Sequence, residues 1–216
     1  MKLAVLIPAA GEGRRLGKGP KALLPLGDKT ILEQTVAAFE GLVSDIRVAV
    51  SDTMLKKTQQ LLPNVSVVLG AGTRQETVYN LLQATDAQYV LIHDAARPFL
   101  EVSIFNAVVE SLKSHPAVSV AKGVADSLIF RNTGETLERS QLAAVQTPQA
   151  FHLELITEAH DYAKQMQLTA TDDAALVRLL GQDVKLVDGS SWLDKITTPA
   201  DYERAQALVE VWRARP

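Results

Sequence analysis

The chain has 216 residues, of which 47% are hydrophobic and 22% are charged, and its formal net charge is −3. This balance is typical of a globular protein with a sizeable core. No block of basic residues appears, so we do not expect a nucleic-acid-binding protein. The absence of cysteine excludes disulfides, thiolate nucleophiles and cysteine-ligated metal sites.

Residues 2–8 form a short apolar run that resembles the core of a signal peptide. The sequence GEGRR follows almost at once, at 11–15, and is charged where a cleavage region would be small and neutral. We therefore interpret the run as a strand buried on both faces. No stretch has the apolar length that spans a bilayer. We expect a cytoplasmic protein without a membrane partner.

Apolar runs alternate with helical patterns along most of the chain. In chain order, the pattern predicts a strand at 2–8, a loop at 9–29, a helix at 31–42, a strand at 46–50, a helix at 53–62, a strand at 65–69, a helix at 73–84, a strand at 88–93, a helix at 102–114, a strand at 117–122, helices at 152–166 and 173–181, a strand at 184–187 and a helix at 199–213. This alternation predicts an α/β fold, with a mostly parallel twisted sheet and helices on both faces.

The alternation breaks after Lys122. Residues 123–146 contain the turn sequence Asn132-Thr133-Gly134 between two short strand-like stretches. We interpret this segment as a β-arm that projects from the sheet. Because an isolated hairpin is marginally stable in water, we expect the arm to mediate a homodimer. No linker or repeat divides the chain, so we expect one domain over residues 1–216.

A glycine-rich loop follows the first strand, but it matches neither of two common phosphate-binding motifs. A Rossmann fingerprint needs glycine at the position of Leu16, and a Walker A loop needs a hydroxyl residue at the position of Gly19. A solvated surface loop is the competing interpretation. The glycine-rich loop follows the first strand of a parallel sheet, and this position favours ligand binding instead. Four cations there suit a phosphate-rich ligand: Arg14, Arg15, Lys18 and Lys21.

Four ordered motifs resemble those of the 2-C-methyl-D-erythritol 4-phosphate cytidylyltransferases. They are PAAGEGRR at 8–15 followed by PK at 20–21, IHDAARP at 92–98, QTPQ at 146–149 and TDDA at 171–174. The resemblance runs from the first strand to about Thr198. It implies a nucleotidyltransferase that transfers CMP from CTP to a polyol phosphate with the help of Mg²⁺ or another divalent cation. It also implies a dimer in which each arm reaches the partner subunit's active site.

The same resemblance implies a role for each of a set of residues. At the reacting triphosphate it implies Arg15, Lys21 and Lys195. For the nucleotide it implies Ala9, Ala10, Gly11, Gly13, Arg14, Gly72, Arg74, Thr77 and Ala95. For the acceptor it implies Asp94, Arg97, Ser127, Arg139, Thr147 and Thr171. Ser127 and Arg139 would serve the partner subunit's site, and Asp94 would also contact the metal ion.

The chemistry suits this set, because attack on the α-phosphorus by an acceptor phosphate needs no protein nucleophile. It needs two polyanions held together and charge stabilised on the leaving pyrophosphate. Asp94 suits Mg²⁺, although a residue in its position could equally cap the turn that follows. We interpret His93 as a hydrogen-bonded structural residue rather than a base.

The sequence departs from the family pattern at three positions. Ala71 stands in place of the second of two glycines, Ser127 in place of threonine, and Leu193 in place of an asparagine near Lys195. Three alternatives stay open. They are the same reaction on ribitol 5-phosphate, a non-catalytic nucleotide-binding protein of the same fold, and a nicotinamide oxidoreductase, which the failed fingerprint disfavours.

Overall fold

The computed structural model describes residues 2–11, 13, 16, 17 and 19–215. Arg14, Arg15 and Lys18, which we predicted as phosphate-binding cations, lie outside these residues. Within the described part, no helix is long and apolar enough to cross a membrane.

The fold is built on a seven-stranded sheet of order β11-β7-β10-β6-β1-β4-β5. The pairs β1–β4, β1–β6, β4–β5 and β11–β7 are parallel, and only β10 runs antiparallel to its neighbours β6 and β7. Its strands are β1 (Leu3–Pro8), β4 (Asp45–Val50), β5 (Ser66–Leu69), β6 (Tyr89–Ile92), β7 (Ala117–Gly123), β10 (Ala143–His152) and β11 (Lys185–Asp188). The predicted mostly parallel α/β sheet is confirmed.

Helices cover both faces of the sheet. One apolar core packs α1 (Ile31–Ala37), α2 (Asp52–Leu61) and α4 (Val102–Leu112) against one face. A second packs α3 (Arg74–Gln83), α5 (Leu153–Gln165) and α6 (Asp173–Leu179) against the other. A third, smaller core joins α7 (Pro199–Arg213) to the short hairpin of β2 (Pro25–Leu26) and β3 (Lys29–Thr30). Strands buried on both faces explain why the sequence shows continuous apolar runs.

Local sequence signals account for several helix ends. Thr30 and Glu33 form a capping box, with the Thr30 N–H donating to Glu33 at 2.8 Å and the Glu33 N–H donating to Thr30 at 3.2 Å. Thr198 caps α7 ahead of Pro199. The first helix is shorter than expected, because the chain turns after Ala37 and Gly41 takes a positive φ of 77°.

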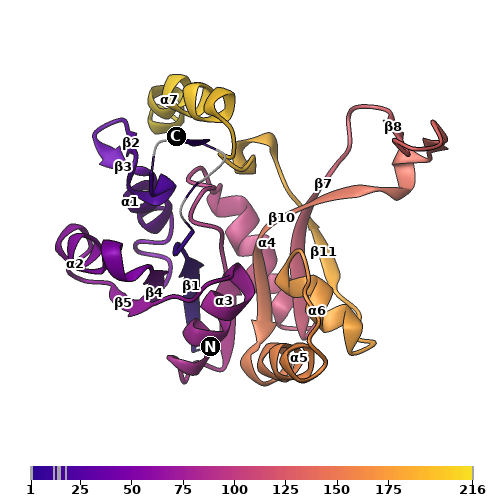
Figure 1. Cartoon of the computed structure of the whole chain (residues 1–216), viewed down its shortest axis with the longest axis horizontal. Coiled ribbons are helices and arrows are strands. Elements are labelled where there is room, and N and C mark those ends of the chain that lie inside the picture. Colours follow the sequence, from indigo (N-terminus) through magenta and orange to yellow (C-terminus); the bar gives the residue numbers. More distant parts are fainter. Residues whose placement is uncertain (1, 12, 14–15, 18, 216) are drawn as a thin grey trace.

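The segment after β7 is the predicted arm. β7 and β10 leave the sheet side by side and carry β8 (Leu128–Ile129) and β9 (Thr136–Leu137) away from the helices (Figure 1). Gly134, at the predicted turn, has a φ of 73°. A 3₁₀ turn, η3 (Arg139–Gln141), leads back into β10. Because β7 runs to Gly123 and β10 begins at Ala143, the arm proper is shorter than residues 123–146.

The strand β10 is the main element that the sequence did not predict. Residues 146–149 read Gln-Thr-Pro-Gln, without the alternation of a strand and with a proline that removes a backbone donor. The register between β10 and β7 shifts between Val145 and Gln149, which accommodates this irregular stretch. Gln146, Thr147 and Gln149 are buried and make hydrogen bonds to other elements. Because a run of polar residues is typical of a loop, the sequence did not indicate a strand here.

Candidate active site

A cleft of about 360 Å³ opens at the carboxyl ends of β1, β5 and β6. This is the edge at which parallel sheets bind ligands. The loop after β1 and the loop before α3 both contribute walls. Its lining comprises Pro8, Ala9, Ala10, Gly11, Gly13, Lys21, Ala22, Ala71, Gly72, Thr73, Arg74, Thr77, Asp94, Ala95, Ala96, Lys195 and Thr197.

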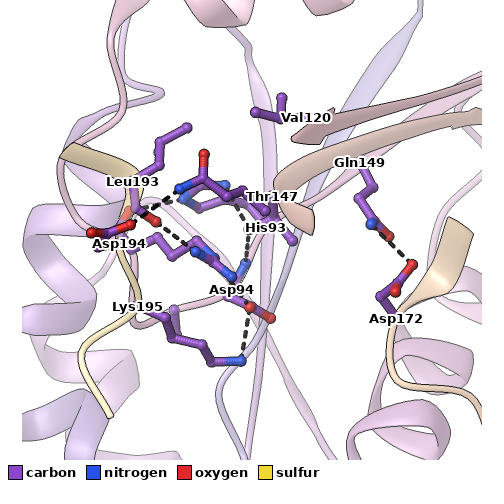
Figure 2. A network of polar contacts seen from close by, with 12 residues as sticks. His93, Asp94, Val120, Thr147, Gln149, Asp172, Leu193, Asp194 and Lys195 are labelled. Atoms are coloured by element: carbon purple, nitrogen blue, oxygen red, sulfur yellow. Dashed lines mark hydrogen bonds and ion pairs between the residues drawn. The ribbon is translucent and has the colours of Figure 1, made fainter. Parts of the chain in front are cut away.

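The carboxylate of Asp94 lines this cleft and pairs with three cations. Figure 2 shows its contact with Lys195. Lys195 Nζ donates to its Oδ2 at 2.8 Å, and Arg74 Nε donates to its Oδ1 at 3.1 Å. Arg97 Nε approaches Oδ2 at 3.4 Å. The Asp94 side chain is only 9% exposed, so these pairs form largely away from water.

The cations determine the protonation state of Asp94. Burial by itself raises the pKa of this carboxyl group, but Arg74, Lys195 and Arg97 outweigh it and hold the pKa well below its usual range. For Arg97 the balance is reversed, because burial lowers the pKa of the guanidinium more than Asp94 raises it. Asp94 is therefore an ionised carboxylate surrounded by excess positive charge, and an anionic ligand would relieve that excess.

Arg74 is held by a second buried carboxylate. Its Nη2 lies 2.8 Å from Asp173 Oδ2, and Asp173 Oδ1 lies 3.2 Å from His160 Nε2. Burial opposes the charge on Arg74, but Asp173 and Asp94 together raise its pKa above the ordinary value. The guanidinium is thus fixed at the cleft by carboxylates from two different elements, which limits the conformations that it can adopt.

Asp173 owes its position to Gln149 of β10. The Gln149 side-chain carbonyl accepts from the backbone N–H groups of Asp173 and Ala174 at 3.1 and 3.0 Å. Its amide donates to Asp172, the N-cap of α6, at 3.1 Å (Figure 2). Gln149 therefore ties the start of α6 to the sheet and fixes where the Asp173 carboxylate can lie.

The turn after β6 is fixed by His93 and Thr147. His93 Nε2 lies 2.9 Å from the backbone oxygen of Arg97, and Thr147 Oγ1 accepts from the Asp94 N–H at 3.0 Å. Burial lowers the pKa of His93 to about 4, so the ring is neutral at neutral pH. The expectation that His93 is a structural residue agrees with these contacts.

The segment that carries Lys195 closes the cleft from the side of α7. Ile196 N–H donates to Ala96 O at 2.9 Å, and Lys21 Nζ donates to Ile196 O at 2.6 Å. The two lysines that the sequence predicted therefore lie on one wall, although they are far apart in the chain. Leu193 is fully buried, and its backbone oxygen accepts from Arg97 Nη1 at 2.5 Å.

Most of the predicted site residues that the structure describes line this one cleft. Arg97 and Thr147 lie immediately behind Asp94, and Thr171 stands just before α6. None of these three residues lines the cleft itself, and two more predicted residues lie farther away, on the arm. Ser127 is on the arm, and Arg139 is in η3, where its guanidinium donates to Ala125 O at 2.7 Å. Arg14 and Arg15 are outside the described residues.

Sequence reasoning missed several residues of the site. Thr73, Ala96 and Thr197 line the cleft. Asp173 pairs with Arg74, and Gln149 accepts from the backbone N–H of Asp173. One signal was available, because Thr73 and Glu76 form a capping box like the one at Thr30 and place the start of α3 beside the cleft. Gln149 lies in the QTPQ motif at residues 146–149, but its role was not predicted, because its partners lie on another element.

A glycine-rich loop and clustered cations at the carboxyl edge of a mostly parallel sheet define a nucleotide-binding α/β protein. Among the residues that the structure describes, no group of three or more histidines, aspartates and glutamates could hold a metal ion alone. Within the described lining, Asp94 is the one carboxylate.

Comparison with known proteins identifies the family. The sequence model of the 2-C-methyl-D-erythritol 4-phosphate cytidylyltransferases matches residues 3–211. The enzyme of that name from Deinococcus radiodurans is 43% identical, over 96% of this chain and 89% of its own. The one from Thermus thermophilus is 41% identical, over 99% of this chain and 100% of its own. The chain belongs to the 2-C-methyl-D-erythritol 4-phosphate cytidylyltransferase family.

Solved structures agree with this assignment. The crystal structure of the Thermus thermophilus cytidylyltransferase superposes with a TM-score of 0.87 at 38% identity and covers 97% of this chain and 100% of its own. The 4-diphosphocytidyl-2C-methyl-D-erythritol synthase from Anaerococcus prevotii also gives a TM-score of 0.87, at 26% identity, covering 97% and 96% of the two chains. The fold is therefore that of the family.

We predict that Asp94→Asn destabilises the free protein, because it leaves Arg74, Arg97 and Lys195 facing one another without a carboxylate. Urea unfolding should show a loss of about 3 kcal/mol in the free energy of unfolding. Asp86→Asn is the matched control, since Asp86 pairs with Lys2 at the exposed surface, and it should unfold at the wild-type midpoint. Equal midpoints for wild type and Asp94→Asn would contradict the electrostatic role of Asp94.

Proposed function

We propose that this chain transfers CMP from CTP to 2-C-methyl-D-erythritol 4-phosphate, which yields 4-diphosphocytidyl-2-C-methyl-D-erythritol and pyrophosphate. The observation that carries the proposal is the family match over residues 3–211, in a chain whose cleft gathers Lys21, Arg74 and Lys195 around Asp94. Relatives carry the name of this enzyme at up to 43% identity. The match favours the methylerythritol acceptor over ribitol 5-phosphate. The proposed location is the cytoplasm.

In the proposed reaction, an oxygen of the acceptor phosphate attacks the α-phosphorus of CTP. The bond from the α-phosphorus to the oxygen that bridges to the β-phosphate breaks, and pyrophosphate leaves. Lys21 and Lys195 would hold the triphosphate and stabilise the charge that develops on it. Arg15 of the glycine-rich loop would join them. These fixed cations also reduce the repulsion between the two polyanions, which is the main obstacle to their approach.

The nucleotide would lie between the two walls of the cleft. Ala9, Ala10, Gly11 and Gly13 are small residues that let a ligand approach the backbone. Arg14, the next residue in the sequence, would also bind the nucleotide. Gly72, Arg74, Thr77 and Ala95 would face the cytosine and ribose. The loop at residues 70–73 is already ordered, because Thr77 Oγ1 accepts from the Ala71 N–H at 3.0 Å. A Cβ on Gly70 would lie 2.5 Å from Ala10, so this close approach of the walls needs glycine.

The acceptor would bind on the side of Asp94 that faces away from the nucleotide. Arg97, Thr147 and Thr171 would surround its phosphate and hydroxyl groups, together with Ser127 and Arg139 from the arm of a second copy. Arg97 offers a guanidinium fork suited to phosphate, and its backbone and side chain are already anchored by His93 and Leu193.

Asp94 would be the protein ligand of Mg²⁺. The donor set fits this ion, which is usually held by one or two carboxylates together with substrate phosphates and water. When bound, the ion would neutralise charge on the triphosphate. In the free protein Lys195 and Arg74 take up the oxygens of Asp94, and the negative phosphates would attract Lys195 away from it.

We predict pyrophosphate release with CTP, Mg²⁺ and 2-C-methyl-D-erythritol 4-phosphate, and at least about tenfold less with ribitol 5-phosphate.

Lys195→Met and Arg15→Ala should each lower turnover by about 10²- to 10³-fold, because each removes a charge that stabilises the transition state. Lys113→Met, which removes a surface lysine paired with Glu110, is the control and should keep the wild-type rate. CTP binding without pyrophosphate release from either acceptor would contradict the proposal.

The arm supports a homodimer. Ile129 and Phe130 are 59% and 47% exposed on it, and Val145 at its base is 39% exposed. The strands β8 and β9 have only two residues each, and a hairpin of this size gains little stability alone. Burial of these apolar side chains against a second copy would stabilise the arm and bring Ser127 and Arg139 to the partner subunit's cleft.

We predict that the wild-type protein sediments as a dimer at micromolar concentration and that Ile129→Asp sediments as a monomer, because it would bury a charge in the interface. Val211→Asp is the matched control, since Val211 is 55% exposed on α7, and it should remain a dimer. If the arm serves the partner's site, Ile129→Asp should also raise the acceptor KM. A monomeric wild type would rule out this arrangement.

A further inference from the structure

The segment at residues 189–195 begins where β11 ends and carries the proposed catalytic lysine, Lys195, at its end. Three backbone contacts fix it. Gly189 N–H donates to Ala121 O at 2.8 Å, Ser190 O accepts from Gln146 Nε2 at 2.9 Å, and Leu193 O accepts from Arg97 at 2.5 Å. We call this stretch the Lys195 segment.

Asp194 gives the Lys195 segment its side-chain link to the sheet. Its Oδ1 pairs with Lys122 Nζ and also accepts from Gln146 Nε2 at 3.4 Å. Lys122 lies near the end of β7, and Gln146 lies on β10. These are the two strands that continue into the arm (Figure 1). The residue next to the proposed catalytic lysine is therefore bound to the base of the arm.

The packing around Gln146 shows that this arrangement is closely fitted. Gln146 is only 2% exposed. A Cβ added to Gly189 would lie 2.2 Å from Gln146 Oε1 and 2.8 Å from Val120 Cγ1. No side chain fits at Gly189 unless Gln146 moves, so the glycine lets the amide reach both Ser190 and Asp194.

Leu193 explains why the link falls on Asp194. Leu193 is buried in the main apolar core and its side chain has no polar group, so only its backbone oxygen takes part in hydrogen bonding. At residues 193 and 194, the polar side-chain contact therefore comes from Asp194.

We infer that Asp194, held by Lys122 and Gln146 at the base of the arm, is a positioning residue for Lys195. The inference rests on the proposed role of Lys195 at the triphosphate. A lysine side chain is a flexible four-carbon stem, so the position of its ammonium group is well defined only if the backbone that carries it is fixed. Asp194 fixes that backbone one residue away, while Lys195 Nζ extends to Asp94 (Figure 2).

The Lys122–Asp194 ion pair should contribute little to the stability of the fold. The two side chains are 28% and 44% exposed, and ion pairs at such positions add little to the free energy of unfolding. A small displacement of a catalytic group, by contrast, costs much turnover, about 10²-fold for roughly 1 Å. Loss of Asp194 should thus separate activity from stability.

The test compares Asp194→Ala with wild type in the pyrophosphate assay. We expect kcat to fall by about 10- to 100-fold, the CTP KM to change less than threefold or so, and the thermal midpoint to stay at the wild-type value. Gln146→Leu, which keeps the shape but removes the amide, should lower kcat in the same way, and Lys122→Arg should restore what Lys122→Ala loses. Asp86→Ala removes another aspartate paired with a lysine and should keep wild-type kinetics.

A double-mutant cycle separates positioning from an independent effect. If Asp194 acts through Lys195, Asp194→Ala combined with Lys195→Met should be no slower than Lys195→Met alone. Additive losses, or a wild-type kcat for Asp194→Ala beside a slow Lys195→Met, would overturn the inference and leave the proposed function intact. A wild-type rate for Lys195→Met would overturn the role of Lys195 itself, and this inference with it.

Discussion

Three cations share the carboxylate of Asp94, and the geometry of the cleft follows from that interaction. Arg74 comes from the start of α3, Arg97 from the turn after β6, and Lys195 from the segment before α7. The Asp94 carboxylate thus joins three elements, and with Asp173, which also pairs with Arg74, it leaves two buried carboxylates facing three cations. The free protein therefore presents a preorganised positive site, which is what a reaction between two polyanions requires.

The sheet and its helices could be predicted because their signals are local. Continuous apolar runs marked the buried parallel strands, and capping residues such as Thr30 and Thr198 marked helix starts. The strand β10 could not be predicted in the same way, because Gln146, Thr147 and Gln149 are polar residues whose burial is compensated only by partners distant in the chain. Their hydrogen bonds exist only once the fold has formed.

The residues of the candidate site also fall into two groups, those that the sequence marks locally and those that it does not. The motifs at residues 8–15 and 92–98 located the glycine-rich loop and Asp94, since small residues and a strand-end carboxylate stand out in the sequence. The residues that support them were not assigned a role. Asp173, which pairs with Arg74, lies in the motif at residues 171–174, but neither it nor Asp194, beside Lys195, was among the predicted site residues. Both act by contacts across more than one element, which a single sequence does not display.

The most direct test of this account is a crystal structure of the protein with CTP and Mg²⁺. The account predicts the triphosphate in the cleft between the glycine-rich loop and the Lys195 segment, with Lys21 and Lys195 within hydrogen-bonding distance of phosphate oxygens and Lys195 drawn away from Asp94. CTP bound outside this cleft, or phosphates that leave the Lys195–Asp94 pair intact and touch neither lysine, would contradict it.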